Sequence, residues 1–194
     1  MAAAAGARRG QDGGKTRVLM VCLGNICRSP TAEAVFQALI DRRGLGDEIE
    51  VDSCGTGGGS AGWYKDGGFS YHEGDAADSR MTAVAKERGV KLTSRSRPLT
   101  PEDLNTFDYI MAMDYDNVTA IFRAADYWST SGKEVPPRSE VEGKVRRMAT
   151  YCTKTKEEVV PDPYYGGKAG FELVLDLLED ACTGLIDEIV AKRK

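Results

Sequence analysis

Residues 18–30 read VLMVCLGNICRSP, and this short stretch carries most of the structural information in the chain. The apolar run from Val18 to Val21 predicts a buried strand, and Pro30 suits the first turn of a helix. A strand that passes through a tight loop into a helix N-terminus directs backbone N–H groups and the positive end of the helix dipole toward one point. The stretch therefore predicts a loop that binds an anion.

The residue types inside this loop suit a tetrahedral oxyanion with a nucleophile beneath it. Five residues separate Cys22 from Arg28, whose planar guanidinium can hold two oxygens at once. Gly24 permits a sharp turn, and Asn25 tolerates a left-handed backbone. We expect Ser29 to cap the helix and to donate its hydroxyl to Cys22. Surrounded by these donors, Cys22 should have a lowered pKa and act as a nucleophile near neutral pH.

Strand and helix patterns alternate along the rest of the chain, which predicts an α/β fold around a parallel sheet. In such sheets, ligands bind outside the carboxyl ends of the strands. The glycine-rich stretch from Gly55 to Gly74 predicts the longest irregular loop, beside the anion site. Residues 1–15 predict a disordered tail ahead of one domain at 16–194. The expected strands are 16–22, 48–53, 108–113 and 145–151, and the expected helices are 29–43, 79–88, 115–125 and 171–192, with a further helix start at 99–103 and a largely irregular stretch at 129–142.

Composition narrows the function classes. The 194 residues are 41% hydrophobic, enough for a real core, and their net charge of −4 argues against nucleic acid as a partner. The sequence carries no secretory or membrane-spanning pattern, so we expect no membrane partner and a reducing, cytoplasmic location. The five cysteines and the single histidine, His72, have no metal-ligand spacing, so we expect neither a metal nor a cofactor.

Three segments together resemble the low-molecular-weight protein tyrosine phosphatases. Val21 to Pro30 is similar to that family's Cys-x5-Arg-Ser active-site loop, and Val160 to Gly166 is similar to its Asp-Pro-Tyr-Tyr loop. Asn105 to Asp114 resembles the family's Phe-Asp-x-Ile-x-x-Met-Asp strand. The likeness extends from about Arg17 to about Ile189. It implies a flavodoxin-like, Rossmann-type domain, in which a four-stranded parallel sheet has helices on both faces and a phosphate-binding loop after its first strand.

The resemblance implies hydrolysis of phosphotyrosine, and of small aryl phosphates, through a phosphocysteine on Cys22. The departing phenolic oxygen has a pKa of about 10, so it needs a proton, which Asp162 would supply before acting as the base for the attacking water. Arg28 and the loop amides would stabilise the equatorial oxygens. The resemblance assigns the phosphate-binding loop to Leu23, Gly24, Asn25, Ile26, Cys27 and Ser29.

The resemblance also implies where substrate choice is made. Tyr71 matches a position at which relatives carry a Trp or Tyr that stacks on the substrate ring, and Tyr164 and Tyr165 would face it. A deep aromatic slot would admit phosphotyrosine and exclude the shorter phosphoserine. Trp63 and Tyr64 lie in an insert relative to shorter family members, and we expect them to pack on the surface.

Two supporting positions follow the family pattern, and one position departs from it. Ser53 matches a serine that braces the phosphate loop through Asn25, and Asp114 resembles an acidic residue that supports the site from behind. Ser94 stands where many relatives have a His, so we expect the bracing of Ser29 to differ.

Three other interpretations stay open. Arsenate reductases of the same fold use a similar cysteine loop because arsenate resembles phosphate in shape, although they need further cysteines to relay a disulfide. A non-catalytic phosphotyrosine or anion binder would keep the loop without the chemistry. Cys22 and Cys27 resemble the pair that relatives use as a reversible oxidation guard, which would suit a redox sensor. We expect a monomer whose partners are phosphotyrosine-containing proteins.

Overall fold

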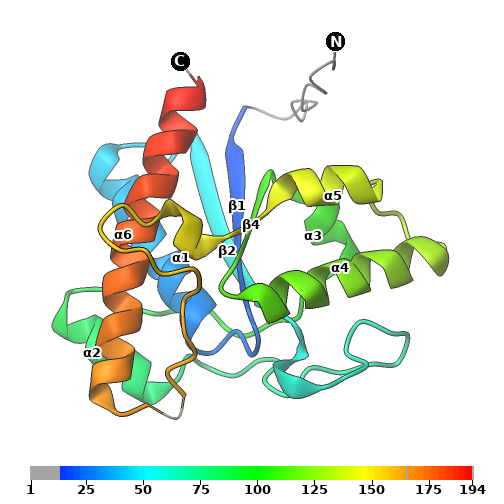
Figure 1. Ribbon diagram of the computed structural model, residues 1–194, viewed down its shortest axis with the longest axis horizontal. Helices are drawn as coiled ribbons and strands as arrows, with labels where there is room; N and C mark the ends of the chain where they lie inside the picture. Colours follow the sequence, from blue (N-terminus) through cyan, green and yellow to red (C-terminus); the bar gives the residue numbers. More distant parts are fainter. Residues whose placement is uncertain (1–13, 165, 194) are drawn as a thin grey trace.

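The computed structural model describes residues 14–164 and 166–193, so most of the predicted tail lies outside the described residues. Its centre is a four-stranded parallel sheet in the order β2-β1-β3-β4 (Figure 1). The strands are β1 (Thr16–Cys22), β2 (Ile49–Gly55), β3 (Tyr109–Ala112) and β4 (Val145–Arg147), and the helices are α1 (Arg28–Arg43), α2 (Ser79–Glu87), α3 (Pro101–Thr106), α4 (Tyr115–Thr130), α5 (Arg138–Lys144) and α6 (Lys168–Arg193), with short 3-10 turns η1 (Gly57–Gly59) and η2 (Met148–Tyr151).

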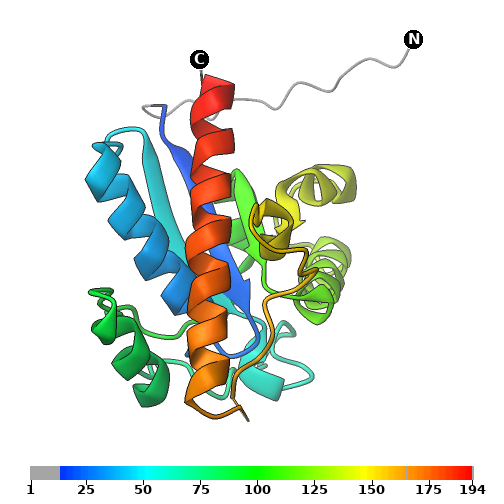
Figure 2. The same cartoon turned by 60° about the vertical axis from the view of Figure 1, so that its left-hand side comes forward.

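Helices cover both faces of the sheet, as the sequence predicts. α1, α2 and α6 lie on one side, and α3, α4 and α5 lie on the other (Figure 1, Figure 2). The side chains of β1 explain this arrangement, because successive residues of a strand point to opposite faces. Val18 and Met20 share a core with residues of α1 and α6, whereas Leu19 and Val21 share a core with residues of α4. β1 is therefore buried on both faces.

The structure differs from the prediction in the region of α4 and α5. α4 continues to Thr130 rather than ending near Ala125, because Trp128 is buried on its inner face. Arg138 to Lys144 form α5, which begins inside the stretch 129–142 expected to be largely irregular and ends beyond it, and this helix buries Val141 against the α4 side of the sheet. Both differences come from apolar side chains that find a core partner distant in sequence.

The ends of two other elements also differ. The fourth strand stops at Arg147 rather than Tyr151, since Met148 and its neighbour turn inward and begin η2. β2 extends to Gly55, two residues beyond the predicted Ser53, because it pairs with β1 along its whole length. The type of each predicted strand is nevertheless confirmed.

Three segments meet at the carboxyl edge of the sheet, which lies at the bottom of Figure 1: the loop between β1 and α1, the loop after β2, and the segment that leads into α6. The fold therefore brings together the parts of the chain in which the sequence predicts site residues. Within residues 14–164 and 166–193, no helix is long and apolar enough to cross a membrane, and no three metal-ligating side chains are grouped.

Candidate active site

The loop between β1 and α1 surrounds the sulfur of Cys22 with donors. Cys22 is the last residue of β1, and Arg28 is the first residue of α1. The Asn25 N–H donates to Cys22 Sγ at 3.3 Å, and the Ser29 hydroxyl donates to the same sulfur at 3.1 Å. Asn25 has a φ of 52°, the left-handed conformation that the sequence predicts. The sulfur thus lies in a cradle at the amino-terminal end of a helix.

Arg28 is buried and held by acidic partners. Its side chain is only 3% exposed, and its Nη1 donates to Asp114 Oδ2 at 2.5 Å and to the Val160 carbonyl at 3.1 Å. Its Nη2 lies 3.3 Å from Asp162 Oδ2. Burial alone would lower the pKa of Arg28, but the charges of Cys22, Asp114 and Asp162 raise it above its usual value. The guanidinium is therefore a permanent cation in a fixed position.

Cys22, Arg28 and Asp162 line one cavity of about 260 Å³. The side chain of Asp162 is 45% exposed, and its Oδ1 accepts the Tyr164 N–H at 3.1 Å. The Arg80 guanidinium lies 5.0 Å from the centre of the Tyr164 ring, which supports one aromatic wall. The described residues that line the cavity are Cys22, Leu23, Gly24, Ile26, Cys27, Arg28, Gly58, His72, Asp162 and Tyr164.

Tyr71, the residue expected to face Tyr164, is not among the described residues that line the cavity. Tyr71 is 62% exposed and pairs with Phe69, while the neighbouring His72 lines the cavity. The Tyr71 N–H donates to the Gly57 carbonyl at 3.3 Å, which holds the backbone of this segment against η1. Tyr165, the remaining expected wall residue, lies outside the described residues.

Trp63 is a core residue, so the expectation that it packs on the surface is wrong. It is 8% exposed, and its ring meets that of Trp128 edge-on at 6.0 Å. Trp128 Nε1 also donates to the Tyr64 carbonyl at 2.8 Å. The physical reason is mutual packing with Trp128, a residue far along the chain, which attaches the insert to α4.

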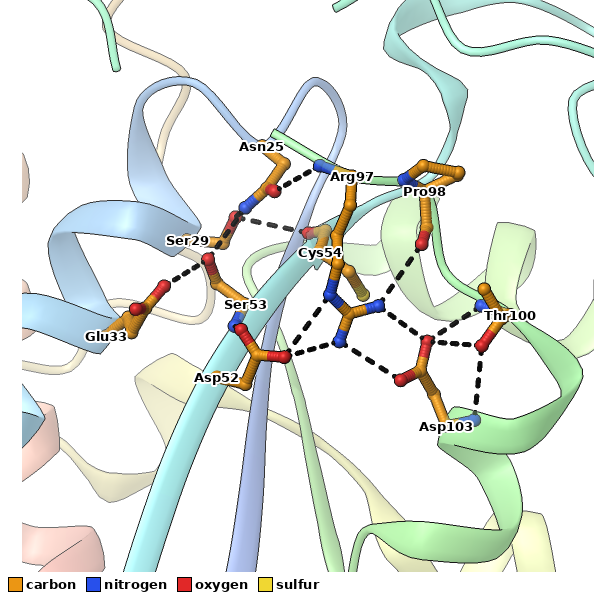
Figure 3. Close-up of polar contacts among 10 residues, drawn as sticks. All are labelled: Asn25, Ser29, Glu33, Asp52, Ser53, Cys54, Arg97, Pro98, Thr100 and Asp103. Carbon is orange, nitrogen blue, oxygen red and sulfur yellow. Dashed lines mark hydrogen bonds and ion pairs between the residues drawn. The ribbon is translucent and has the colours of Figure 1, made fainter. Parts of the chain in front are cut away.

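A set of hydrogen bonds behind the loop holds Asn25 in one orientation (Figure 3). Asn25 Nδ2 donates to Ser29 Oγ at 2.9 Å and to Ser53 Oγ at 2.8 Å. Asn25 Oδ1 accepts the Arg97 N–H at 2.9 Å. Because both amide hydrogens and the amide oxygen have partners, the side chain cannot flip without losing them. The expected contact between Ser53 and Asn25 is confirmed.

The hydroxyl of Ser29 lies between two acceptors. It is 3.1 Å from Cys22 Sγ and 3.2 Å from the Cys54 carbonyl, and it has one hydrogen to donate. Ser29 is not the helix cap that we expected, since Cys27 occupies the N-cap position and makes no side-chain cap bond. A negatively charged sulfur would attract the single hydrogen, because hydrogen bonds to charged acceptors are the stronger ones.

Two residues that the sequence did not single out hold this set of bonds together. Arg97 forms ion pairs with Asp52 at 2.7 Å and with Asp103 at 2.9 Å, which connect the end of β2 to α3 (Figure 3). Glu33 Oε2 accepts the Ser53 hydroxyl at 2.5 Å. Most of these partners lie far apart in the sequence, so no local sequence pattern predicts their contacts.

Ser94 acts on the same set of bonds through Glu33. Ser94 is close enough to lower the pKa of the Glu33 carboxyl, so the position at which relatives often have a His is connected to Ser29 through Glu33, Ser53 and Asn25. Burial raises the pKa of the Glu33 carboxyl above its usual value, although hydrogen bonds from Ser53 and Ser94 lower it. Glu33 is thus an acid whose charge is unfavourable in the folded state.

We expect the Glu33→Gln variant to be more thermally stable than the wild type at pH 7, by about 1 to 2 °C. Glutamine keeps an oxygen that can accept the Ser53 hydroxyl and carries no charge to desolvate. Because the folded-state pKa of Glu33 is raised, protonation of Glu33 stabilises the folded protein. This stabilisation is complete below the unfolded-state pKa of about 4.3 and is lost as the pH rises through the folded-state pKa. The difference between variant and wild type should therefore be largest at neutral pH and should shrink as the pH falls toward about 4.

Thermal unfolding from pH 4 to pH 8 measures this difference, with the exposed Glu73→Gln as the control. A Glu33→Gln variant that is less stable than the wild type at every pH would contradict the argument, because it would mean that the charge itself stabilises the fold.

Cys27 shares the cavity with Cys22 but has a different environment. Burial, followed by the charge of Cys22, raises the pKa of the Cys27 thiol well above its usual range. Cys27 is thus a protonated thiol at neutral pH, and Cys22 is the cysteine to which the loop offers hydrogen-bond donors.

Comparison with known proteins agrees with this geometry. The family model described as low molecular weight phosphotyrosine protein phosphatase matches residues 17–194. The chain belongs to this family. A putative low molecular weight protein-tyrosine-phosphatase from Synechocystis is 45% identical to this phosphatase over 173 residues, which cover 89% of this chain and 96% of the relative.

Solved structures give the same result for the fold of the phosphatase. A protein tyrosine phosphatase from Entamoeba histolytica superposes with a TM-score of 0.77 at 41% identity, covering 93% of this chain and 100% of the other. An arginine phosphatase from Drosophila superposes with a TM-score of 0.70 at 27% identity, covering 89% and 96%. The chain is a hydrolase of the protein tyrosine phosphatase class, and its substrates are phosphoproteins.

The structure brings most of the predicted site residues of this phosphatase together. Those that line the cavity are Cys22, Leu23, Gly24, Ile26, Cys27, Arg28, Asp162 and Tyr164, and those that hydrogen-bond to the lining residues or to their immediate partners are Asn25, Ser29, Ser53 and Asp114. Two further described residues line the cavity without having been predicted as site residues, Gly58 and His72, and the local signals for them are the glycine-rich stretch after β2 and the position next to Tyr71.

Proposed function

We propose that this phosphatase hydrolyses phosphotyrosine in proteins through a phosphocysteine on Cys22, with Asp162 as general acid and then general base. One observation carries the proposal: a sulfur that accepts two hydrogen bonds, a buried guanidinium, and a carboxyl 3.3 Å from that guanidinium meet at one cavity. Phosphoryl transfer needs a positioned nucleophile, neutralisation of the phosphoryl charge and a proton for the leaving oxygen. These three groups supply them.

In the first step, the sulfur of Cys22 attacks phosphorus, and the bond between phosphorus and the phenolic oxygen breaks. Asp162 donates its proton to that oxygen, so the phenol leaves uncharged. The fork of Arg28 binds two equatorial oxygens, and the loop N–H groups bind the rest. The loop residues proposed for this role are Leu23, Gly24, Asn25, Ile26, Cys27 and Ser29.

In the second step, a water attacks the phosphocysteine and gives a proton to Asp162. The bond between sulfur and phosphorus breaks, phosphate leaves, and the thiolate of Cys22 is restored. The Ser29 hydroxyl, 3.1 Å from the sulfur, stabilises the departing thiolate. Asp114 holds Arg28 at 2.5 Å throughout, and Ser53 holds the Asn25 amide at 2.8 Å. The proposed steps use no metal and no cofactor.

We infer that the depth of the sulfur sets the substrate class. Cys22 is only 2% exposed, so the phosphoryl group must be carried on a side chain long enough to reach it. A phenyl ring has that length and can pack against Tyr164, which lines the cavity, whereas the side chain of phosphoserine is shorter. Direct ring contacts from Tyr71 and Tyr165 stay predictions.

We also propose the cellular setting that the sequence suggested. All five cysteines are free thiols, which suits a reducing compartment and hence the cytoplasm. The net charge of −4 argues against nucleic acid as a partner, and we propose a monomer without membrane association, whose domain spans 16–194. Cys22 and Cys27 line the same cavity, which supports a reversible oxidation guard.

The test is a substrate panel for the wild-type protein: p-nitrophenyl phosphate, a phosphotyrosine peptide, the matched phosphoserine and phosphoarginine peptides, and arsenate with a thiol reductant. We expect hydrolysis of the first two and at least about a hundredfold lower kcat/KM for phosphoserine, about 3 kcal/mol of transition-state binding. Phosphoarginine turnover in preference to phosphotyrosine, or arsenate reduction without phosphatase activity, would overturn the proposal.

A further inference from the structure

We propose that Phe69 and Tyr71 form a docking surface for a large apolar residue that lies one or two positions from the phosphotyrosine of a substrate protein. The proposal rests on the proposed function and adds a rule for choosing among phosphotyrosine substrates. It assigns to Phe69, which lies in the glycine-rich loop after β2, a role in specificity rather than in the chemical steps.

The two aromatic rings are presented to solvent as a pair. Phe69 is 57% exposed and Tyr71 is 62% exposed, and their ring centres are 5.1 Å apart in an edge-to-face arrangement. Trp63 of the same loop is only 8% exposed, so an aromatic side chain of this segment can be buried in the core. Neighbouring exposed aromatic residues of this kind are typical of interaction sites, because they leave apolar area in water until a partner covers it.

The loop that carries the pair is held in place. The ring of Trp63 packs against that of Trp128 on α4, and Trp128 Nε1 donates to the Tyr64 carbonyl. Closer to the pair, the Gly68 N–H donates to the Lys65 carbonyl at 2.8 Å, and a Cβ on Gly68 would lie 2.2 Å from a backbone oxygen. The backbone next to Phe69 is therefore tightly packed. A rigid surface loses less conformational entropy than a flexible one when it binds a partner.

The pair is continuous with the catalytic cavity. The Gly58 N–H donates to the Leu23 carbonyl at 2.9 Å, and a Cβ on Gly58 would lie 3.4 Å from Tyr71 Cβ. Gly58 and His72, the residue after Tyr71, both line the cavity. The aromatic surface thus begins where the cavity lining ends. An extended peptide advances about 3.3 Å per residue, so a residue one or two positions from the phosphotyrosine can reach this surface.

Charge near the pair favours an apolar neighbour over an acidic one. Glu73 and Asp75 are exposed close to Tyr71 in the sequence, and Asp75 Oδ2 lies 3.2 Å from His72 Nδ1. An acidic residue at the same place on the substrate would be repelled by these carboxylates. Leu23, which is 41% exposed on the catalytic loop, adds apolar area on the same side as Gly58. The carboxylates thus disfavour an acidic occupant, and the exposed apolar area of Phe69, Tyr71 and Leu23 selects an aliphatic or aromatic side chain of the phosphotyrosine polypeptide.

The test uses two phosphotyrosine peptides that differ only in the two positions on each side of the phosphotyrosine, which are leucine in one and serine in the other. Each kcat/KM is divided by the same enzyme's value for p-nitrophenyl phosphate, which reports the chemistry alone. We expect the wild type to prefer the leucine peptide by about fivefold, and Phe69→Ala to reduce this preference to about one through a higher KM. Phe69→Tyr should retain most of it. The control variant is Leu173→Ala, an exposed apolar residue of α6 at 47% exposure, which should keep the full preference.

Three outcomes would overturn the inference while leaving the proposed function intact. The wild type could hydrolyse both peptides equally well, Phe69→Ala could lower both ratios by the same factor, or Leu173→Ala could lose the preference as fully as Phe69→Ala. Failure of the wild type to hydrolyse either peptide or p-nitrophenyl phosphate is a distinguishable result, because it would remove the proposed function and this inference together.

Discussion

Replacement of Cys22 by serine is expected to lower kcat for p-nitrophenyl phosphate by at least about 10⁴-fold, because the other thiol of the described lining, Cys27, has a pKa well above its usual range and stays protonated. A serine hydroxyl is a far weaker acid than a thiol, and the two groups that contact the sulfur are hydrogen-bond donors. The Asn25 N–H and the Ser29 hydroxyl both donate to Sγ, at 3.3 and 3.1 Å. The loop is thus arranged to stabilise negative charge on the sulfur, and neither of these two donors is a base that could deprotonate an alcohol.

Steady-state kinetics and calorimetric titration with inorganic phosphate together test this expectation. The Cys22→Ser variant should still bind phosphate, since Arg28 and the loop amides are unchanged. Cys152→Ser is the matched control, because Cys152 is a half-buried cysteine whose Sγ hydrogen-bonds to the Leu177 carbonyl, away from the cavity lining. We expect its kcat within about twofold of the wild type, as is usual for positions outside the site. A Cys22→Ser variant with more than about one per cent of wild-type kcat would rule out the phosphocysteine mechanism.

Replacement of Asp162 by asparagine is expected to lower kcat for phenyl phosphate by about 10² to 10⁴-fold, the usual contribution of a general acid. The effect should be much smaller for p-nitrophenyl phosphate, whose leaving oxygen is more acidic and needs less help from a proton. Asparagine has nearly the same shape and can still accept the Tyr164 N–H that Asp162 Oδ1 accepts at 3.1 Å. The loss is therefore attributable to the proton rather than to the loop.

A series of aryl phosphates with leaving groups of increasing pKa measures this effect as a slope. The plot of log kcat against leaving-group pKa should be steep for Asp162→Asn and shallow for the wild type. Asp176→Asn is the control, since Asp176 lies on α6 and pairs with Arg88 at 2.5 Å. Equal slopes for Asp162→Asn and the wild type would assign the general acid to another group, and His72 would then be the first candidate in the lining.

The parts of the fold that could be predicted are those with local signals. β1 and the start of α1 follow from an apolar run, a glycine-containing turn and a proline in the first helical turn, all within residues 18–30. The end of α4 could not be predicted in the same way. Its last turn exists because Trp128 packs on Trp63, which lies far earlier in the chain, and local propensity does not report such a partner.

The residues of the candidate site can also be divided into those with a local sequence signal and those without one. Cys22, Arg28 and Asp162 could be singled out because chemistry requires those residue types in two short motifs, and the fold brings both motifs to one cavity. Glu33 and Arg97 could not, since each is an ordinary charged residue until the fold places it beside Ser53 or Asp52. The pKa and the partners of a charged side chain depend on its surroundings, and these surroundings form only when the chain folds.

The local sequence accounts for the reaction, because a cysteine, a turn and an arginine within one short loop define an oxyanion site wherever a strand leads into a helix. The folded chain accounts for the orientation of that site and for its surroundings. It turns His72 rather than Tyr71 into the cavity, and it leaves Phe69 and Tyr71 in solvent beside it. The reason is the range of the interactions: turn and cap preferences act over a few residues, whereas packing and ion pairing act between segments that only folding brings into contact.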